Sequence, residues 1–193
     1  MSSEQDTSFA RLVSLAAHDL RTPLATVHGF ARTIQRTAKL EAPLDRYVEM
    51  ITAAAAQMTD LLETMSLAAR IEDDRYEPVF AEADTLALAE AAAADAEGVR
   101  AEGTGAAIET DTDAVQRSLS ALASCAKRHG GFDEVTLHVD GTDVRLSPVG
   151  QAAPIVLGEE LRDLGAAVAV RTVEALGGSV ERANDSVLIR LRR

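Results

Sequence analysis

Apolar residues recur every seven positions along the first seventy residues of the chain. One row contains Val13, Leu20, Val27 and Ile34, and a row offset by four contains Ala17, Leu24, Ala31 and Ala38. After a break, a further row contains Leu44, Ile51, Met58 and Met65, with Tyr47/Val48, Ala54/Ala55 and Leu61/Leu62 between its members. A seven-residue apolar repeat is typical of helices that pack along a shared seam. The pattern therefore predicts two long helices.

The break between these helices falls at residues 39–43. Pro43 disfavours continuation of the first helix and suits the first turn of the second. A hairpin of two helices cannot cover both of its apolar stripes by itself, whereas two paired hairpins bury them in a four-helix bundle. We therefore predict a homodimer in which residues 7–72 of each chain form the hairpin. The acidic run at 72–74 is expected to be a solvated linker.

The heptad pattern also assigns a position to His18. With Ala17 and Leu24 at the a positions, His18, Asp19 and Thr22 fall at b, c and f, so all three are expected to face solvent. Pro23 should bend the helix just after His18, and its cost of about 3 kcal/mol in a helix interior is not explained by packing. The other histidines have no comparable context and are assigned structural or solvent roles; they are His28, His129 and His138.

Composition narrows the class of protein. The chain has 193 residues, with 19 Lys plus Arg against 31 Asp plus Glu and a net charge of −12. This charge disfavours nucleic acid and anionic membrane surfaces, so a protein partner is expected. The chain has no apolar run of about 18 residues and no signal-peptide pattern, so we expect a cytoplasmic protein. The single Cys125 excludes an internal disulfide, and no Cys/His spacing predicts a metal.

Residues 18–24, His-Asp-Leu-Arg-Thr-Pro-Leu, resemble the H-box of bacterial sensor histidine kinases of the HisKA type, and all seven positions agree with its pattern. The resemblance implies that His18 is the phospho-acceptor. It also implies that Asp19 hydrogen-bonds the imidazole, and that Thr22 helps to position a water when a partner is dephosphorylated. The chemistry is reasonable because neutral imidazole is a nucleophile near pH 7, which an adjacent carboxylate can orient.

The resemblance continues through the rest of the chain. Residues 76–97 are similar to the first strand and helix of a kinase ATP-binding domain, and 108–129 and 164–181 to later parts of it. Alternation independently predicts strands at 133–140 and 143–148, joined at Asp140-Gly141, with a last strand at about 186–192 that closes the sheet. The implied fold class is α+β: a hairpin forming a dimeric four-helix bundle, then a degenerate kinase-like α/β sandwich at 76–193.

The groups with which such kinases hold ATP are replaced in this sequence. Cys125 stands where an asparagine should hold Mg²⁺, and 147–151 lack the carboxylate that reads adenine. Asp163 places a negative charge in the remnant of a Gly-x-Gly, where the triphosphate should sit. The interval between these last two segments, about fifteen residues, is too short for a typical ATP lid. We therefore expect no bound cofactor and no autokinase activity, with Cys125 serving as a small buried hydrophobe.

The favoured interpretation is a histidine phosphotransfer protein of a phosphorelay. His18 would accept phosphate from one receiver-domain aspartate and donate it to another, and the receiver would supply Mg²⁺. Small residues beside His18 would leave room for docking; they are Ala25, Thr26 and Gly29. A stand-alone relay, with a receiver phosphatase activity through Thr22, fits this interpretation. The alternatives are an active kinase with an unusual ATP site and a non-catalytic dimeric adaptor.

Overall fold

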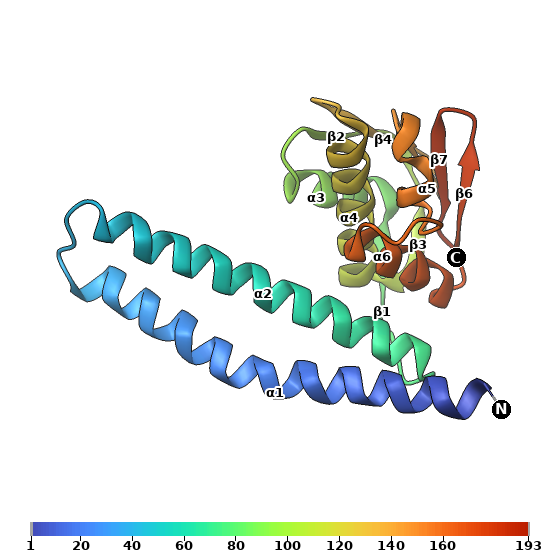
Figure 1. The fold of residues 1–193 in the computed structure, drawn as a ribbon. Coiled ribbons are helices and arrows are strands. Elements are labelled where there is room, and N and C mark those ends of the chain that lie inside the picture. The colour runs from blue at the N-terminus through green and yellow to red at the C-terminus, as the bar shows by residue number, and fades with distance from the viewer. Residues whose placement is uncertain (1, 193) are drawn as a thin grey trace. The chain divides into compact units, whose positions relative to one another are not determined.

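The computed structural model describes the backbone of residues 2–192 and the side chains of residues 10–192. Contacts within the chain divide it into two compact units, with the boundary between Tyr76 and Glu77. The first unit is a helical hairpin and the second is an α/β domain (Figure 1). This arrangement confirms the predicted α+β fold class. Among the described residues, no helix is both long and apolar enough to span a bilayer.

The hairpin consists of α1 (Ser2–Thr37) and α2 (Leu44–Glu72). Pro43 is the N-cap of α2, one position before the first turn in which it was predicted. Helix α1 continues through Pro23, and it changes direction about halfway along its length, as the proline predicted (Figure 1). The residues buried along the hairpin are mostly alanines: Ala10, Ala17 and Ala31 on α1, and Ala55, Leu62 and Ala69 on α2. Short side chains at a seven-residue spacing form the contact inside one hairpin.

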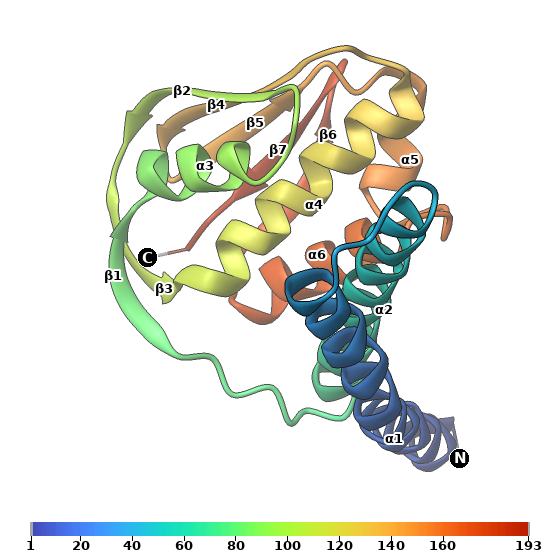
Figure 2. The same ribbon diagram turned by 90° about the vertical axis from the view of Figure 1, so that its left-hand side faces the viewer.

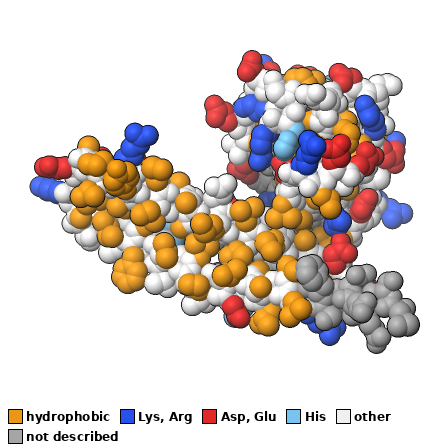
Figure 3. Space-filling model, viewed as in Figure 1, with side chains coloured by type: hydrophobic (Ala, Val, Ile, Leu, Met, Phe, Trp, Pro, Cys, Tyr) orange, Lys and Arg blue, Asp and Glu red, His pale blue; other side chains and the backbone are white. Residues whose placement is uncertain are grey.

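The other apolar rows of the hairpin remain uncovered in the single chain. Leu20, Val27 and Ile34 are 55%, 49% and 42% exposed. On α2 the exposed row is Leu44, Ile51 and Met58, which are members of the apolar row predicted there. Figure 3 shows hydrophobic side chains spread along the hairpin surface. Homodimerisation stays a prediction, and this face is the surface that it would bury.

The acidic run at 72–74 was expected to be a solvated linker, but Asp73, at the end of α2, has a buried side chain. This side chain is only 1% exposed and forms ion pairs with Arg11, at 3.4 Å, and with Arg75. The Arg11 contact joins the early part of α1 to the end of α2. The carboxylate therefore links the two helices at the end of the hairpin opposite its loop.

The second unit contains two sheets and a layer of helices. Its helices are α3 (Thr85–Ala94), α4 (Thr112–Gly130), η1 (Gly150–Ala152), α5 (Ala153–Val156) and α6 (Leu164–Ala175). Its strands are β1 (Phe80–Asp84), β2 (Val99–Gly105), β3 (Ala107–Asp111), β4 (Val135–Gly141), β5 (Asp143–Ser147), β6 (Ser179–Ala183) and β7 (Ser186–Arg190). The main sheet has the order β2-β4-β5-β7-β6, and β1 pairs with β3 separately. Since β2 is parallel to β4 and the other pairs are antiparallel, the main sheet is mixed.

One face of the main sheet carries the core. Along β4, Val135, Leu137 and Val139 are buried, whereas His138 between them is exposed, as expected when only one face is covered. Helices α3, α4 and α6 lie over that face (Figure 2). Strand β7 pairs with both β5 and β6, so the last strand lies inside the sheet and does not close its edge. Strand β2 was not predicted.

Candidate functional site

His18 lies on the outer side of α1, where its side chain is 75% exposed. Its Nδ1 atom is 3.2 Å from Oδ1 of Asp19, whose side chain is 69% exposed. An ionised carboxylate can only accept hydrogen bonds, so Nδ1 carries the proton in this contact. Nε2 of the neutral ring then keeps its lone pair. The arrangement presents an oriented nucleophile to solvent.

The other predicted site residues share this side of the helix. At about 100° per residue, His18, Thr22, Ala25 and Gly29 fall within a sector of about 60° around the helix axis. Thr26 lies about 40° beyond this sector, on the side of Thr22, and its hydroxyl donates a hydrogen bond to the carbonyl of Thr22 at 3.1 Å. All five residues are exposed. A Cβ atom added at Gly29 would have no neighbour within 4 Å, so this position borders open space.

The opposite side of the same helical segment is anchored. Ala17 is buried and Leu24 is half-buried, so the backbone beside His18 is held on its inner side. Pro23 has no N–H to donate to the carbonyl of Asp19, which leaves that carbonyl without its helical partner. The H-box thus combines a packed inner face with an outer face whose reactive group is free.

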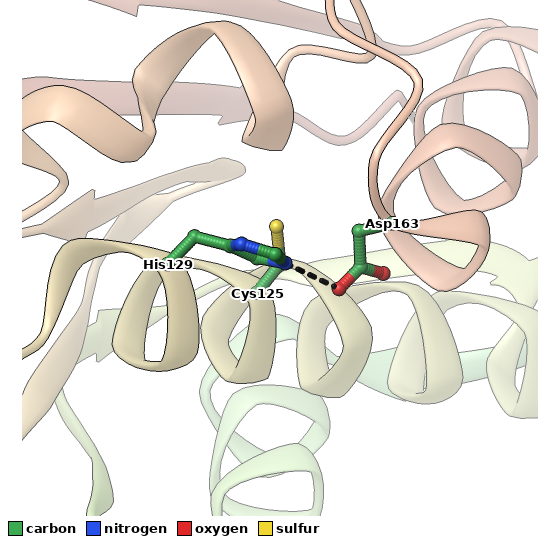
Figure 4. A group of neighbouring side chains, drawn as sticks. All are labelled: Cys125, His129 and Asp163. Carbon is green, nitrogen blue, oxygen red and sulfur yellow. Dashed lines mark hydrogen bonds and ion pairs between the residues drawn. The ribbon is translucent and has the colours of Figure 1, made fainter.

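A second group of polar side chains gathers in the α/β unit, where α4 meets the start of α6 (Figure 4). The thiol of Cys125, the imidazole of His129 and the carboxylate of Asp163 each have one atom within 4.8 Å of the other two. His129 was expected to have a structural or solvent role, and its Nε2 lies 3.3 Å from Oδ2 of Asp163. Asp163 also caps α6, since its Oδ1 accepts from the N–H of Ala166 at 3.0 Å.

Electrostatics in this group favour the protonated thiol. Burial, and then the negative charge of Asp163, raise the pKa of the Cys125 thiol to about 12. Arg128 acts in the opposite direction and lies 3.6 Å from Oδ2 of Asp163. In the absence of a bound cation, Cys125 is therefore a neutral, buried side chain, as its apolar context predicted.

The segment between β5 and α6 is the one that the sequence analysis found too short for a typical ATP lid. It contains the short helices η1 and α5. Ala152, Ala153 and Val156 from these elements are buried in the hydrophobic core. These buried side chains complete the hydrophobic core beside α4. The chain then passes to Asp163 at the start of α6.

Comparisons with known proteins agree with this architecture. Residues 10–74 match the family described as His Kinase A (phospho-acceptor) domain. The chain is 29% identical to histidine protein kinase DivJ of Caulobacter vibrioides, over 93% of this chain and 32% of that protein. It therefore spans about a third of the length of this curated relative.

Two solved structures share the fold. Full-length ShkA in complex with AMPPNP is 23% identical with a TM-score of 0.65, covering 93% of this chain and 44% of that one. The Acinetobacter baumannii histidine kinase AdeS is 20% identical with a TM-score of 0.56, covering 91% of this chain and 98% of that one. Both likenesses concern the hairpin together with the α/β unit.

Proposed function

We propose that this chain, whose residues 10–74 match the His Kinase A (phospho-acceptor) domain family, is a histidine phosphotransfer protein that exchanges phosphate with receiver domains without using ATP. The observation that carries the proposal is the exposed His18, with Nδ1 held by Asp19 at 3.2 Å and Nε2 left available.

The transfer follows from this geometry. The Nε2 lone pair of His18 attacks the phosphorus of a receiver aspartyl phosphate, an N–P bond forms, and the P–O bond to the aspartate breaks. The receiver carboxylate leaves with the bonding electrons. The proton on Nδ1 stays in place, and Asp19 stabilises the positive charge that the ring acquires. Reversal of the same steps passes the phosphate to a second receiver. Mg²⁺ for the reaction is expected on the receiver.

The open face around His18 supports receiver docking. Ala25 and Gly29 continue the sector occupied by His18 and Thr22, Thr26 lies beside it, and all three side chains are small. Thr22, one turn from His18, places a hydroxyl beside the reacting group. The same surface could therefore orient a water for dephosphorylation of a receiver.

We infer that the α/β unit does not use ATP, because its residues do not fit the nucleotide. Cys125 replaces the expected magnesium-binding asparagine with a buried thiol that cannot coordinate through an amide oxygen. The carboxylate of Asp163 is 7% exposed and would face the negative charge of a triphosphate. In addition, η1 and α5 fill the core where a mobile lid would be required.

Homodimerisation is part of the proposal. The row of Leu20, Val27 and Ile34 on α1, with Ile51 and Met58 on α2, gives each hairpin an exposed apolar face. A second hairpin of the same kind would bury it and complete a four-helix bundle. His18 lies outside this row, so the proposed dimer leaves the reactive face open.

An active histidine kinase is the second candidate, since the solved structures of similar fold include one in complex with AMPPNP. Labelling of His18 from Mg-ATP alone would identify a kinase, whereas phosphate transfer itself is tested with the purified chain and a panel of receiver domains phosphorylated with labelled acetyl phosphate. The proposal expects label to move from at least one receiver to the wild-type chain and not to a His18→Ala variant. Equal labelling of that variant, or labelling of neither protein by any receiver, contradicts the proposal.

A further inference from the structure

The three side chains that meet between α4 and α6 are all metal ligands. Cys125 and His129 are four residues apart on α4, so they project from one side of the helix. Asp163 reaches the same point from the N-cap of α6 (Figure 4). Among the described residues of the chain, this is the one group of three or more Cys, His, Asp or Glu side chains close enough to hold an ion.

The spacing of the three ligand atoms suits a small tetrahedral ion. Zinc binds Cys sulfur at about 2.3 Å and His nitrogen or carboxylate oxygen at about 2.0–2.2 Å, which places neighbouring ligand atoms about 3.5 Å apart. Here Nε2 of His129 and Oδ2 of Asp163 are already 3.3 Å apart, and all three atoms lie within 4.8 Å of one another. Small side-chain rotations would therefore be enough to enclose the ion.

The surroundings supply the supporting contacts that a metal site needs. Oδ1 of Asp163 stays bound to the N–H of Ala166 at 3.0 Å, which fixes the carboxylate, while Oδ2 would exchange its contacts with His129 and Arg128 for the ion. The His129 side chain is 26% exposed, whereas that of Asp163 is 7% exposed. The group is thus mostly enclosed, with an approach from solvent on the histidine side.

We propose that Cys125, His129 and Asp163 form a zinc-binding site with one coordination position left for water. A thiolate, an imidazole and a carboxylate together match the borderline-soft preference of Zn²⁺ better than that of Mg²⁺, which favours oxygen ligands. On binding, the metal replaces the thiol proton of Cys125, which passes to solvent, and the proton of the neutral His129 ring moves from Nε2 to Nδ1 so that the Nε2 lone pair can coordinate the ion. The positive charge of Arg128 disfavours the cation, and the bound ion would link α4 to α6.

This site is independent of phosphate transfer, so its test does not use His18. The full-length chain is freed of metal with EDTA and titrated with Zn²⁺ and, as a spectroscopic probe, with Co²⁺. We expect one ion per chain, with tetrahedral Co²⁺ absorption and a thiolate-to-cobalt charge-transfer band. Cys125→Ala removes that band and weakens Zn²⁺ binding by at least about a hundredfold, because a ligand is lost.

Two further variants separate coordination from folding. Asp163→Asn keeps an N-cap side chain for α6 but removes the charged ligand, so it should weaken binding by at least about tenfold while the helical circular dichroism stays unchanged. His138→Gln, on the exposed face of β4, is the matched control and should bind as the wild type does. The proposal is overturned if the wild type binds no stoichiometric Zn²⁺, or if Cys125→Ala or Asp163→Asn binds it equally well.

Discussion

Nδ1 of His18 lies 3.2 Å from Oδ1 of the adjacent Asp19, and both side chains are largely exposed. The contact selects the tautomer with the proton on Nδ1 and leaves Nε2 as the nucleophile. Because it spans a single peptide bond on one helix, it does not depend on the rest of the fold. The reactive group is therefore prepared before any partner binds.

Asp19→Asn should slow phosphate transfer to His18. The amide can still contact the ring, but it cannot balance the charge of the phosphorylated imidazole. We expect a loss on the order of tenfold, below the 10²–10⁴ typical of proton-transfer groups, because the pair is exposed to water. Rapid-quench labelling from a phosphorylated receiver measures the rate. Asp19→Glu keeps the carboxylate and serves as the control; equal rates for the asparagine variant and the wild type would contradict the assigned role.

Substitution at Gly29 should separate docking from chemistry. No atom lies within 4 Å of a Cβ built there, so Gly29→Trp can be accommodated by the hairpin itself but would obstruct a receiver. We expect the receiver concentration needed for half-maximal transfer to rise at least about tenfold, which corresponds to 1.4 kcal/mol of binding free energy. Gly29→Ala should leave transfer unchanged and stabilise the helix by about 0.8–1.0 kcal/mol. Unaltered transfer by the tryptophan variant would exclude Gly29 from the docking face.

The exposed apolar row makes a prediction about oligomeric state. Val27→Asp places a charge in the centre of the proposed dimer interface, where desolvation would be costly. Sedimentation of the wild type should give a dimer, and sedimentation of this variant should give mostly monomer. Arg32→Asp introduces the same side chain at an exposed polar position and should remain dimeric. A monomeric wild type would contradict the proposed dimer.

The Cys125 thiol predicts a dependence of stability on pH. Burial raises its pKa from 9.0 to about 12 in the folded chain. The fold prefers the neutral thiol, so this contribution is fully present below pH 9 and is lost as the pH rises toward 12. Urea unfolding in EDTA measures the free energy of unfolding of the wild type and of Cys125→Ala. Above pH 9, that of the wild type should fall relative to that of the variant. A difference that stays constant up to pH 11 would contradict the buried thiol.

Local patterns were enough to predict the hairpin and the face of His18. The seven-residue repeat fixes which positions share a side of a helix, and Pro23 marks the bend. The repeat could not say which apolar row meets the chain's own partner helix and which is left for another chain. On α2 the inner row is Ala55, Leu62 and Ala69, although larger residues lie in the outer row. Alanines allow the closest helix approach, which hydrophobicity alone does not reveal.

Two features of the α/β unit were not predicted from the sequence: strand β2 and the group of Cys125, His129 and Asp163. Strand β2 was missed because Gly103 and Gly105 interrupt its pattern and few of its side chains are buried. The pairing of Cys125 with His129 could have been recognised from their four-residue spacing on one helix. Asp163 could not have been, since it is separated from His129 by 34 positions and reaches it only when α6 packs on α4. Clusters of this kind are properties of the tertiary fold.

The central claim is that His18 receives its phosphate from another protein rather than from ATP. It is tested most directly by incubating the purified chain with γ-labelled Mg-ATP alone and, in parallel, with a labelled phospho-receiver. The account predicts no label on the chain in the first reaction and label on His18 in the second, absent from His18→Ala. Label on His18 from Mg-ATP alone would contradict it.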